Sequence, residues 1–401
     1  MNLAFVDNLP VGGGLSRFSL LLCKGLIEND KDLRIDYYIH HDNLKMIPEV
    51  NILSDRVHVY TLMTTIPVGI FIRLFTRVRK WLNPNFGVDK GISEIERRIT
   101  QKYDLAYFPS AHMMKRPSLK IPIVGTLHDF NWKYFFGRAI FSPSFVAVMD
   151  VEILKWMKGH NACSSFDVVD EAKKFYPEAL KYPTVVHIAP LVVNVEISDE
   201  RAIELLANLN IDYPYIIFPG NFFPHKNHLN LFAAFSILRK NPKFRDYKLL
   251  LTGMGSDQVP YGIACYKGIE LLNRPDENYD VRGMGYQPNE VIDALIKNAR
   301  LLISPSIYEA ICTPAMDAWS FGTPTAISDI APFREHERVL GVRSAFFDPM
   351  NPKGIAEVLE NYLLDSGQME RDGKISRTNI SKYTWDDVAR GYRAIFEQAI
   401  M

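Results

Sequence analysis

The chain has few cysteines and no excess of charge of either sign. Its four cysteines, Cys23, Cys163, Cys265 and Cys312, lie far apart, and no pair has the spacing of zinc ligands. A disulfide framework is therefore not expected, and a reducing compartment is favoured. The 46 basic residues match the 46 acidic residues, so no global electrostatic field favours nucleic acid as a partner.

Long apolar runs are also missing. No uninterrupted stretch is long enough to cross a bilayer as a helix. Residues 1–7 carry neither the basic start nor the apolar run of a signal peptide, and we expect them to form the first strand. These features predict a cytoplasmic protein.

Several common catalytic signatures are absent. The chain contains no G-x-x-x-x-G-K-[ST] loop, no H-E-x-x-H and no C-x-x-C. The only D-x-D is Asp30-Lys31-Asp32, in a polar turn between a helix and a strand, which is a poor place for a metal bound to a diphosphate. We expect no metal site and no cofactor.

Alternating strands and helices make up most of the chain. At 401 residues and 47% hydrophobic composition, it fits two globular domains. The alternation predicts an α/β fold with two doubly wound domains. The expected strands are 3–6, 35–39, 57–60, 105–108, 121–127, 161–163, 184–188, 215–218, 248–252, 301–304, 325–328 and 344–347; helices are expected at 15–27, 230–239, 290–298 and 385–400. A polar stretch near 194–201 predicts the join, with domains over 1–195 and 196–384.

The segment from Ser304 to Pro324 is the most informative part of the sequence. A polar loop carries Glu309, and the following helix begins near Pro314 and carries Asp317. Carboxylates can accept hydrogen bonds from the hydroxyls of a sugar or ribose, and unpaired amides at 311–315 can meet a diphosphate. The segment therefore predicts a site for a ligand such as a sugar nucleotide. The structural alternative is a helix cap plus a solvated helix acid.

A second polar loop, Gly220–His228, lies between a strand end and a helix start. Lys226 is a point charge suited to phosphate, and His225 and His228 could add donors. The alternative is an ordinary polar turn in which Asn227 caps the helix.

Two further candidates lie in the first half. His128 ends an apolar strand and could face a crevice, where it could contact a sugar hydroxyl or an acceptor, with Asp129 orienting its ring. The alternative is a histidine satisfied by backbone. The Gly12–Gly14 run follows the first strand and would let the backbone approach a ligand closely.

Residues 70–82 combine an apolar helical face with a basic face. This pattern is typical of a helix lying on an anionic membrane surface, which would place the protein on the inner face of the membrane. The alternative is a core-facing helix with a basic solvent face.

Taken in order, these blocks resemble glycosyltransferase family 4. The resemblance covers nearly the whole chain and is strongest from Tyr215 to Asp348. The residues that carry it are Thr126-Leu127-His128-Asp129, Gly12–Gly14, Pro219–Asn227, Leu249–Gly255, Gly283-Met284-Gly285-Tyr286, Ser306-Ile307-Tyr308-Glu309, Pro314, Asp317-Ala318 and Gly322-Thr323-Pro324-Thr325.

The resemblance implies the GT-B fold, with two Rossmann-like domains facing a central cleft. It implies an acceptor-binding N-terminal domain, a nucleotide-sugar-binding C-terminal domain, and a final helix, 385–401, that packs back onto the N-terminal domain. The implied reaction transfers a hexose from a nucleoside-diphosphate sugar to a hydroxyl of a glycan or lipid-linked glycan, with retention and without a metal. Such enzymes serve polysaccharide biosynthesis.

The resemblance also implies roles for individual residues. Glu309, His128 and Lys226 would act at the reacting centre. The residues that would bind the donor are Asp317, Ile311, Cys312, Thr313, Gly220, Asn221, His225, Gly13 and Gly14.

The chain departs from the family pattern at several of these positions. Asp317 replaces a glutamate, and Ala310 and Cys312 replace glycines. An arginine common near residue 221 is missing, so phosphate binding would rest on Lys226 unless Arg282 contributes. Two other functions therefore stay open: a catalytically degenerate protein that binds a sugar nucleotide or a partner, and a sugar-nucleotide epimerase.

Overall fold

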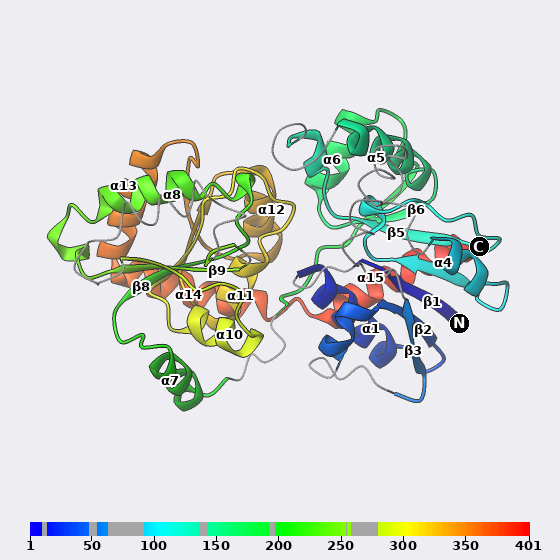
Figure 1. The fold of residues 1–401 in the computed structure, drawn as a ribbon, viewed down its shortest axis with the longest axis horizontal. Helices are drawn as coiled ribbons and strands as arrows, with labels where there is room; N and C mark the ends of the chain where they lie inside the picture. Colours follow the sequence, from blue (N-terminus) through cyan, green and yellow to red (C-terminus); the bar gives the residue numbers. More distant parts are fainter. Residues whose placement is uncertain are drawn as a thin grey trace, which may run out of the picture. The chain divides into compact units, whose positions relative to one another are not determined.

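The computed structural model (Figure 1) describes residues 1–9, 14–47, 54–62, 92–135, 143–191, 197–253, 255–257 and 280–401. The proposed membrane helix at 70–82 lies outside these residues, as do Gly12, Gly13 and Cys265. The chain divides into two compact units. Unit 1 comprises Met1–Ala189 and Thr384–Met401, and unit 2 comprises Pro190–Tyr383.

Unit 1 is built on a parallel sheet with the strand order β3-β2-β1-β4-β5-β6-β7. Its strands are β1 (Asn2–Asp7), β2 (Arg34–His40), β3 (Val57–Leu62), β4 (Leu105–Phe108), β5 (Ile123–Leu127), β6 (His160–Cys163) and β7 (Tyr182–Val185). Its α-helices are α1 (Gly14–Asn29), α4 (Ile92–Arg98), α5 (Pro143–Trp156), α6 (Phe166–Phe175) and α15 (Trp385–Ile400), with short 3₁₀ turns η1 (His41–Met46), η3 (Ala111–Met113) and η4 (Asn131–Lys133). The central strands are buried along their length, as expected of a parallel sheet covered on both faces.

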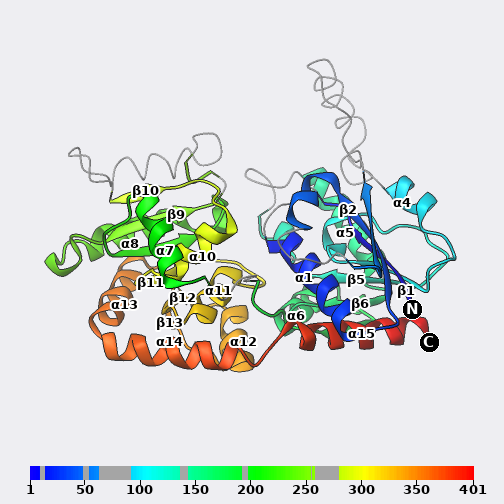
Figure 2. The same cartoon turned by 90° about the horizontal axis from the view of Figure 1, so that it is seen from below.

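Helix α15 belongs to unit 1, although all of unit 2 precedes it in the sequence (Figures 1 and 2). A capping box between Thr384 and Asp387 starts the helix. Tyr392 is fully buried, and its hydroxyl lies 3.0 Å from the hydroxyl of Thr126 in β5. Helix α1 packs beside α15 so closely that a β-carbon at Gly25 would lie 2.8 Å from the carbonyl oxygen of Trp385. Tight packing of α15 thus completes the core of unit 1.

Unit 2 has a second parallel sheet, in the order β10-β9-β8-β11-β12-β13. Its strands are β8 (Tyr215–Pro219), β9 (Lys248–Thr252), β10 (Val281–Gly283), β11 (Leu301–Ser304), β12 (Thr325–Ser328) and β13 (Ala345–Phe347). Its helices are α7 (Asp199–Asn208), α8 (His228–Leu238), α10 (Asn289–Lys297), α11 (Thr313–Phe321), α12 (Ala331–Leu340), α13 (Pro352–Leu364) and α14 (Ser366–Ile380), with 3₁₀ turns η5 (Pro224–Lys226) and η6 (Pro242–Phe244).

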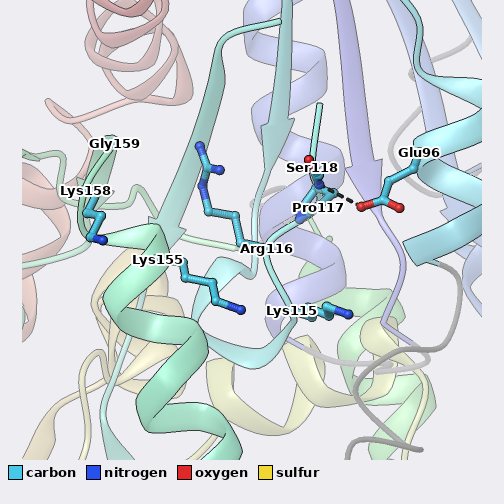
Figure 3. Close-up of a pocket in the computed structure, with 8 residues that line it drawn as sticks. All are labelled: Glu96, Lys115, Arg116, Pro117, Ser118, Lys155, Lys158 and Gly159. Atoms are coloured by element: carbon cyan, nitrogen blue, oxygen red, sulfur yellow. Dashed lines mark hydrogen bonds between the residues drawn. The ribbon is translucent and has the colours of Figure 1, made fainter. Parts of the chain in front are cut away.

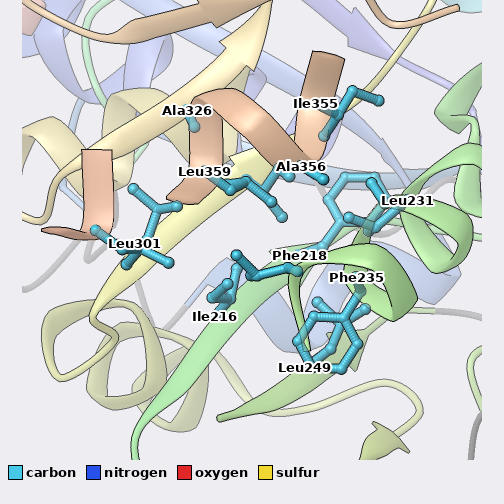
Figure 4. Close-up of a cluster of buried hydrophobic side chains, with 14 of the residues drawn as sticks. Ile216, Phe218, Leu231, Phe235, Leu249, Leu301, Ala326, Ile355, Ala356 and Leu359 are labelled. Carbon is cyan, nitrogen blue, oxygen red and sulfur yellow. The ribbon is translucent and has the colours of Figure 1, made fainter. Parts of the chain in front are cut away.

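The main core of unit 2 lies between its sheet and helices α8 and α13 (Figure 4). Phe218 and Leu249 from the sheet meet Phe235 of α8, and Leu359 of α13 joins the same cluster. The burial of such large apolar side chains stabilises the unit by about 25 cal/mol per Å² of surface removed from water.

The predicted α/β class and the alternation of strands and helices are confirmed. One strand lies earlier than predicted: β7 spans Tyr182–Val185 instead of 184–188. Among the described strands it lies at the edge of the sheet with β6 as its one partner, and the pairing ends where Cys163 meets Val185. Val186, Ile188 and Ala189 are apolar and buried, which resembles a strand in the sequence. The amide of Val186 still donates to the carbonyl oxygen of Cys163 at 2.9 Å, but among the described residues the pairing with β6 goes no further.

A buried carboxyl group lies at the end of the central strand β1. Asp7 is 4% exposed, and the hydroxyl of Tyr37 donates a hydrogen bond to it at 3.2 Å. Burial raises the pKa of Asp7 from 3.8 to about 7, against the lowering effect of hydrogen bonds from Ser19 and Tyr37. The folded protein therefore holds a proton here at pH values where the unfolded chain has lost it.

Asp7→Asn should remove a pH dependence of stability. Between pH 4 and 7 the folded form binds more protons at Asp7 than the unfolded form, so the free energy of unfolding falls as pH rises through this window. From pH 5 to 7, the variant should gain roughly 2 kcal/mol relative to wild type. Urea denaturation at both pH values measures this. Asp32→Asn, at an exposed position, is the control, and an equal pH dependence in wild type and Asp7→Asn would contradict the assignment.

Gly25→Ala should loosen the docking of α15. The added methyl group meets a backbone oxygen that cannot rotate away, so we expect unfolding to become easier by about 1–3 kcal/mol. Gly367→Ala in α14 is the matched control, because its methyl group would meet only the side chains of Arg371 and Asp365. Thermal denaturation measures the melting temperatures of the two variants. Similar values would show that the backbone at the α1–α15 contact can move apart to accept the methyl group at little cost in stability.

Candidate functional site

The loops at the C-terminal edge of the unit 2 sheet are joined by backbone hydrogen bonds. The amide of Gly220 after β8 donates to Thr252 at 3.0 Å, and the amide of Gly253 after β9 donates to Gly285 at 2.8 Å. The amide of Ile307 after β11 donates to the carbonyl oxygen of His225 at 2.8 Å. Four successive strand ends therefore form one connected surface, at the edge where α/β proteins bind ligands.

Glycines make this close approach possible. Gly253 has φ +104°, and a β-carbon there would lie 2.7 Å from the carbonyl of Gly220. A β-carbon at Gly220 itself would lie 3.8 Å from Cδ of Lys226. That distance is an ordinary van der Waals contact, so the aliphatic stem of the lysine passes directly beside Gly220.

Lys226 and Glu309 form the centre of the candidate site. Lys226 Nζ lies 2.5 Å from Glu309 Oε1, and Ser306 Oγ donates to the same oxygen at 2.7 Å. The two side chains are 18% and 12% exposed, so the pair is largely sheltered yet still reaches solvent. An ammonium group has three donors, so Lys226 can bind Glu309 and an anionic ligand at once. Ser306 was not predicted as a site residue. Its position three residues before Glu309, in the same polar loop, is the sequence feature that could have indicated this contact.

Asn227 fixes the backbone that carries Lys226. It has the left-handed φ of 60°, and its side-chain amide donates to the carbonyl oxygens of Pro305, at 2.9 Å, and Pro349, at 2.7 Å. Asn227 is the N-cap residue of α8, as the alternative expected, but its side chain forms no capping hydrogen bond. Asn227 instead ties the loop after β8 to the loops after β11 and β13.

Helix α11 begins beside this pair. A proline occupies its first turn, as predicted, and Cys312 is its N-cap residue. Within the described part of the chain, the amides of Ile311, Cys312 and Thr313 donate no backbone hydrogen bond. Burial, with Glu309 nearby, raises the pKa of the Cys312 thiol to about 12, so the thiol stays protonated and is a poor nucleophile.

Asp317 lies further along α11 and is only 4% exposed. The alternative that treats it as a solvated helix acid is therefore wrong. A carboxylate at such a buried position needs hydrogen-bond donors.

The two histidines of the loop after β8 differ from each other. His225 stacks on Phe223, and burial together with Lys226 lowers its pKa to about 4. His228 is 2% exposed and packs against the ring of Phe222, with ring centroids 3.9 Å apart. Both imidazoles are neutral at pH 7. His228 lies within an aromatic cluster and is not among the polar groups of the site.

Arg282 does not replace the missing arginine. Its guanidinium donates to the carbonyl oxygen of Leu209 at 2.8 Å and approaches the hydroxyl of Tyr213. These contacts tie β10 to the end of α7. The arginine thus supports the domain and leaves Lys226 as the cation beside Glu309.

In unit 1, His128 follows β5 and is 6% exposed. Its Nε2 lies 3.0 Å from the carbonyl oxygen of Pro109, and the rings of Phe18 and His112 pack against it. Burial, with His112 nearby, lowers its pKa to about 3, so the ring is neutral. The backbone contact fits the alternative of a histidine satisfied by backbone. Phe18 belongs to α1, so His128 lies near the helix that begins at Gly14.

Two kinds of feature are missing from the described residues. No group of three or more histidine, cysteine, aspartate or glutamate side chains is placed to hold a metal ion in the described ranges. Within the same ranges, none of the helices combines the length and apolar character needed to span a bilayer.

Residues 204–383 match the family described as glycosyl transferases group 1. O-antigen chain mannosyltransferase B of Escherichia coli is 26% identical over 179 residues, which cover 43% of each chain. An uncharacterized glycosyltransferase of Methanocaldococcus jannaschii is 26% identical over 211 residues, covering 51% of this chain and 50% of the other. The matches span about half the length of these relatives.

Similarity to solved structures extends over the whole chain. Anabaena HepE, in a crystal structure with UDP and glucose, has a TM-score of 0.71 at 15% identity and covers 99% of this chain and 100% of its own. WaaG, a glycosyltransferase involved in lipopolysaccharide biosynthesis, has a TM-score of 0.64 at 12% identity, with 98% of both chains covered. The chain therefore has the GT-B fold, and its similarity to the glycosyl transferases group 1 family covers residues 204–383, which lie in unit 2.

Proposed function

We propose that the protein is a glycosyltransferase that moves a hexose from a nucleoside-diphosphate sugar to a hydroxyl of a glycan or lipid-linked glycan. The observation that carries the proposal is the Lys226–Glu309 pair beside the start of α11, in the segment that matches this family. The amides of Ile311, Cys312 and Thr313 there donate no backbone hydrogen bond among the described residues. The names of two relatives support a sugar substrate: both are mannosyltransferases of Escherichia coli. Structures of HepE with UDP and with UDP-glucose support a nucleotide-sugar donor.

In the proposed complex, the diphosphate of the donor lies between Lys226 and the start of α11. The ammonium group keeps its bond to Glu309 and directs its remaining N–H groups at phosphate oxygens. The amides of Ile311, Cys312 and Thr313 add donors at the positive end of the helix. Asp317 receives the ribose hydroxyls, and Gly220, Asn221 and His225 line the phosphate side of the site.

The proposed reaction breaks the bond between the anomeric carbon and the oxygen of the β-phosphate. The acceptor hydroxyl oxygen forms the new bond to that carbon, and its proton passes to the departing phosphate oxygen. Lys226 and the α11 amides stabilise the charge that develops on the diphosphate, which is an electrostatic mechanism without a metal. If the acceptor hydroxyl attacks from the same face of the sugar from which the diphosphate leaves, the anomeric configuration is retained, as expected of family 4.

Unit 1 is proposed to supply the acceptor side. His128 would contact a sugar hydroxyl of the acceptor. Because its ring is neutral at pH 7, the contact would be a hydrogen bond and not a charge interaction. Gly13 and Gly14 would let the start of α1 approach the ligand. A cytoplasmic location, at the inner face of the membrane if residues 70–82 bind lipid, would suit a lipid-linked acceptor.

Lys226→Met and Glu309→Gln should each reduce kcat/KM for sugar transfer by roughly 100-fold or more, because each removes charge from the reacting centre. Transfer is measured with a labelled nucleotide sugar and a glycan acceptor. Lys240→Met, at an exposed lysine of the same unit, is the control. Wild-type turnover in both site variants, with the fold intact, would refute the assignment.

Donor binding can be separated from turnover by thermal denaturation. UDP-, GDP-, ADP- and dTDP-sugars are screened with and without chelator, and the preferred donor should raise the melting temperature in both conditions. The shift should shrink in Lys226→Met. A shift without transfer would indicate a binding protein, and conversion of the donor sugar without acceptor would indicate an epimerase. Product NMR showing an inverted linkage would exclude retention.

A further inference from the structure

A basic pocket of about 550 Å³ opens on unit 1 (Figure 3). It is formed by a residue of α4, the loop before β5, the end of α5 and the turn before β6. The residues that line it are Glu96, Lys115, Arg116, Pro117, Ser118, Lys155, Lys158 and Gly159. Its volume is in the range of pockets that hold small molecules.

The pocket lies at the N-terminal edge of the unit 1 sheet. Gly159 precedes β6, and its β-carbon position lies 3.7 Å from the carbonyl oxygen of Ile123, the first residue of β5. His128 follows the other end of β5. Since a parallel strand rises about 3.3 Å per residue, the two places are roughly 16 Å apart. The pocket is therefore separate from the acceptor side proposed above.

The acidic groups at the pocket already have protein partners. Glu96 accepts a hydrogen bond from the amide of Ser118 at 2.7 Å (Figure 3), and Glu152 binds Lys155 at 2.6 Å. By contrast, the Arg116 guanidinium and the Lys158 ammonium form no ion pair or hydrogen bond with the described part of the chain. The lining thus carries two positive charges that no described acidic side chain neutralises.

Packing holds Arg116 in place. Its guanidinium carbon lies 5.8 Å from the centre of the Trp156 ring, and the indole donates to the carbonyl oxygen of Met114 at 2.9 Å. Its Nη2 lies 4.0 Å from the β-carbon position of Gly159, next to Lys158. Partial burial lowers the pKa of Arg116, although arginine stays charged at pH 7. A half-buried, preoriented cation of this kind favours binding of an anion.

We propose that this pocket binds a phosphate group, as a monoester or diphosphate, between Arg116 and Lys158. A phosphate dianion matches the two unneutralised charges, and a planar guanidinium can bind two phosphate oxygens at once. The rest of the pocket leaves room for the body of the ligand. The phosphate can belong to a soluble ester or to a phospholipid headgroup, and both sources have the same chemistry at Arg116 and Lys158.

Pyrophosphate titration calorimetry tests the soluble source. The measurement is made in the Lys226→Met background, so that the candidate donor site in unit 2 contributes little to the measured pyrophosphate binding. Failure of the pocket proposal can then be told apart from failure of the proposed function. Arg116→Gln with Lys158→Gln should weaken pyrophosphate binding at least tenfold, whereas Lys120→Gln, an exposed lysine of the same loop, should leave it unchanged. Lys158→Glu alone, also at an exposed position, should weaken binding and guards against misfolding of the double variant.

Co-sedimentation with phosphatidylglycerol vesicles tests the lipid source with the same variants. Vesicle binding that is lost in the double variant and kept in Lys120→Gln would support the pocket as a headgroup site. Pyrophosphate binding with the same dependence would support it as a site for a soluble ester. The proposal is overturned if neither probe binds, or if the double variant and Lys120→Gln bind both probes equally.

Discussion

The candidate site depends on how closely two stretches of backbone approach each other at the edge of the unit 2 sheet. Gly253 lies against the carbonyl of Gly220, where no β-carbon fits, and both residues belong to the hydrogen-bonded set of loops. This contact sets the path of the chain toward Lys226, and the side-chain amide of Asn227 then fixes it against two neighbouring loops. A lysine on a free loop would lose side-chain entropy on binding an anion. Here much of that ordering is already present in the folded domain.

Much of this arrangement could be predicted from the sequence, because parallel strands place all their carboxyl ends at one edge. Lys226 and Glu309 are 83 positions apart, yet each follows a strand of the same sheet, so their meeting follows from the alternation of strands and helices. The proline at the start of α11 was informative for a local reason, since its ring suits the first helical turn. Strand β7 was misplaced because apolar character indicates burial and does not reveal whether a partner strand is present.

Other features depend on contacts that no local pattern reveals. His128 follows strand β5 and His228 begins helix α8, but only the structure shows that the first meets a backbone carbonyl and the second an aromatic cluster. Arg282 is equally ambiguous in sequence, and its partner is the carbonyl of Leu209. The basic pocket was missed because its lining comes from separate segments, each of which carries an ordinary number of lysines.

The position of α15 has a consequence for synthesis on the ribosome. The residues that fill the core of unit 1, Tyr392 and Phe396 among them, are made only after the whole of unit 2. Unit 2 can close as soon as it emerges, while the nascent unit 1 still exposes the apolar face of α1 that will receive α15. Chaperones that recognise exposed apolar surface would therefore meet the first-made half of the chain for longer than the second. Unit 2, which is translated second, can therefore complete its fold before unit 1, which is translated first.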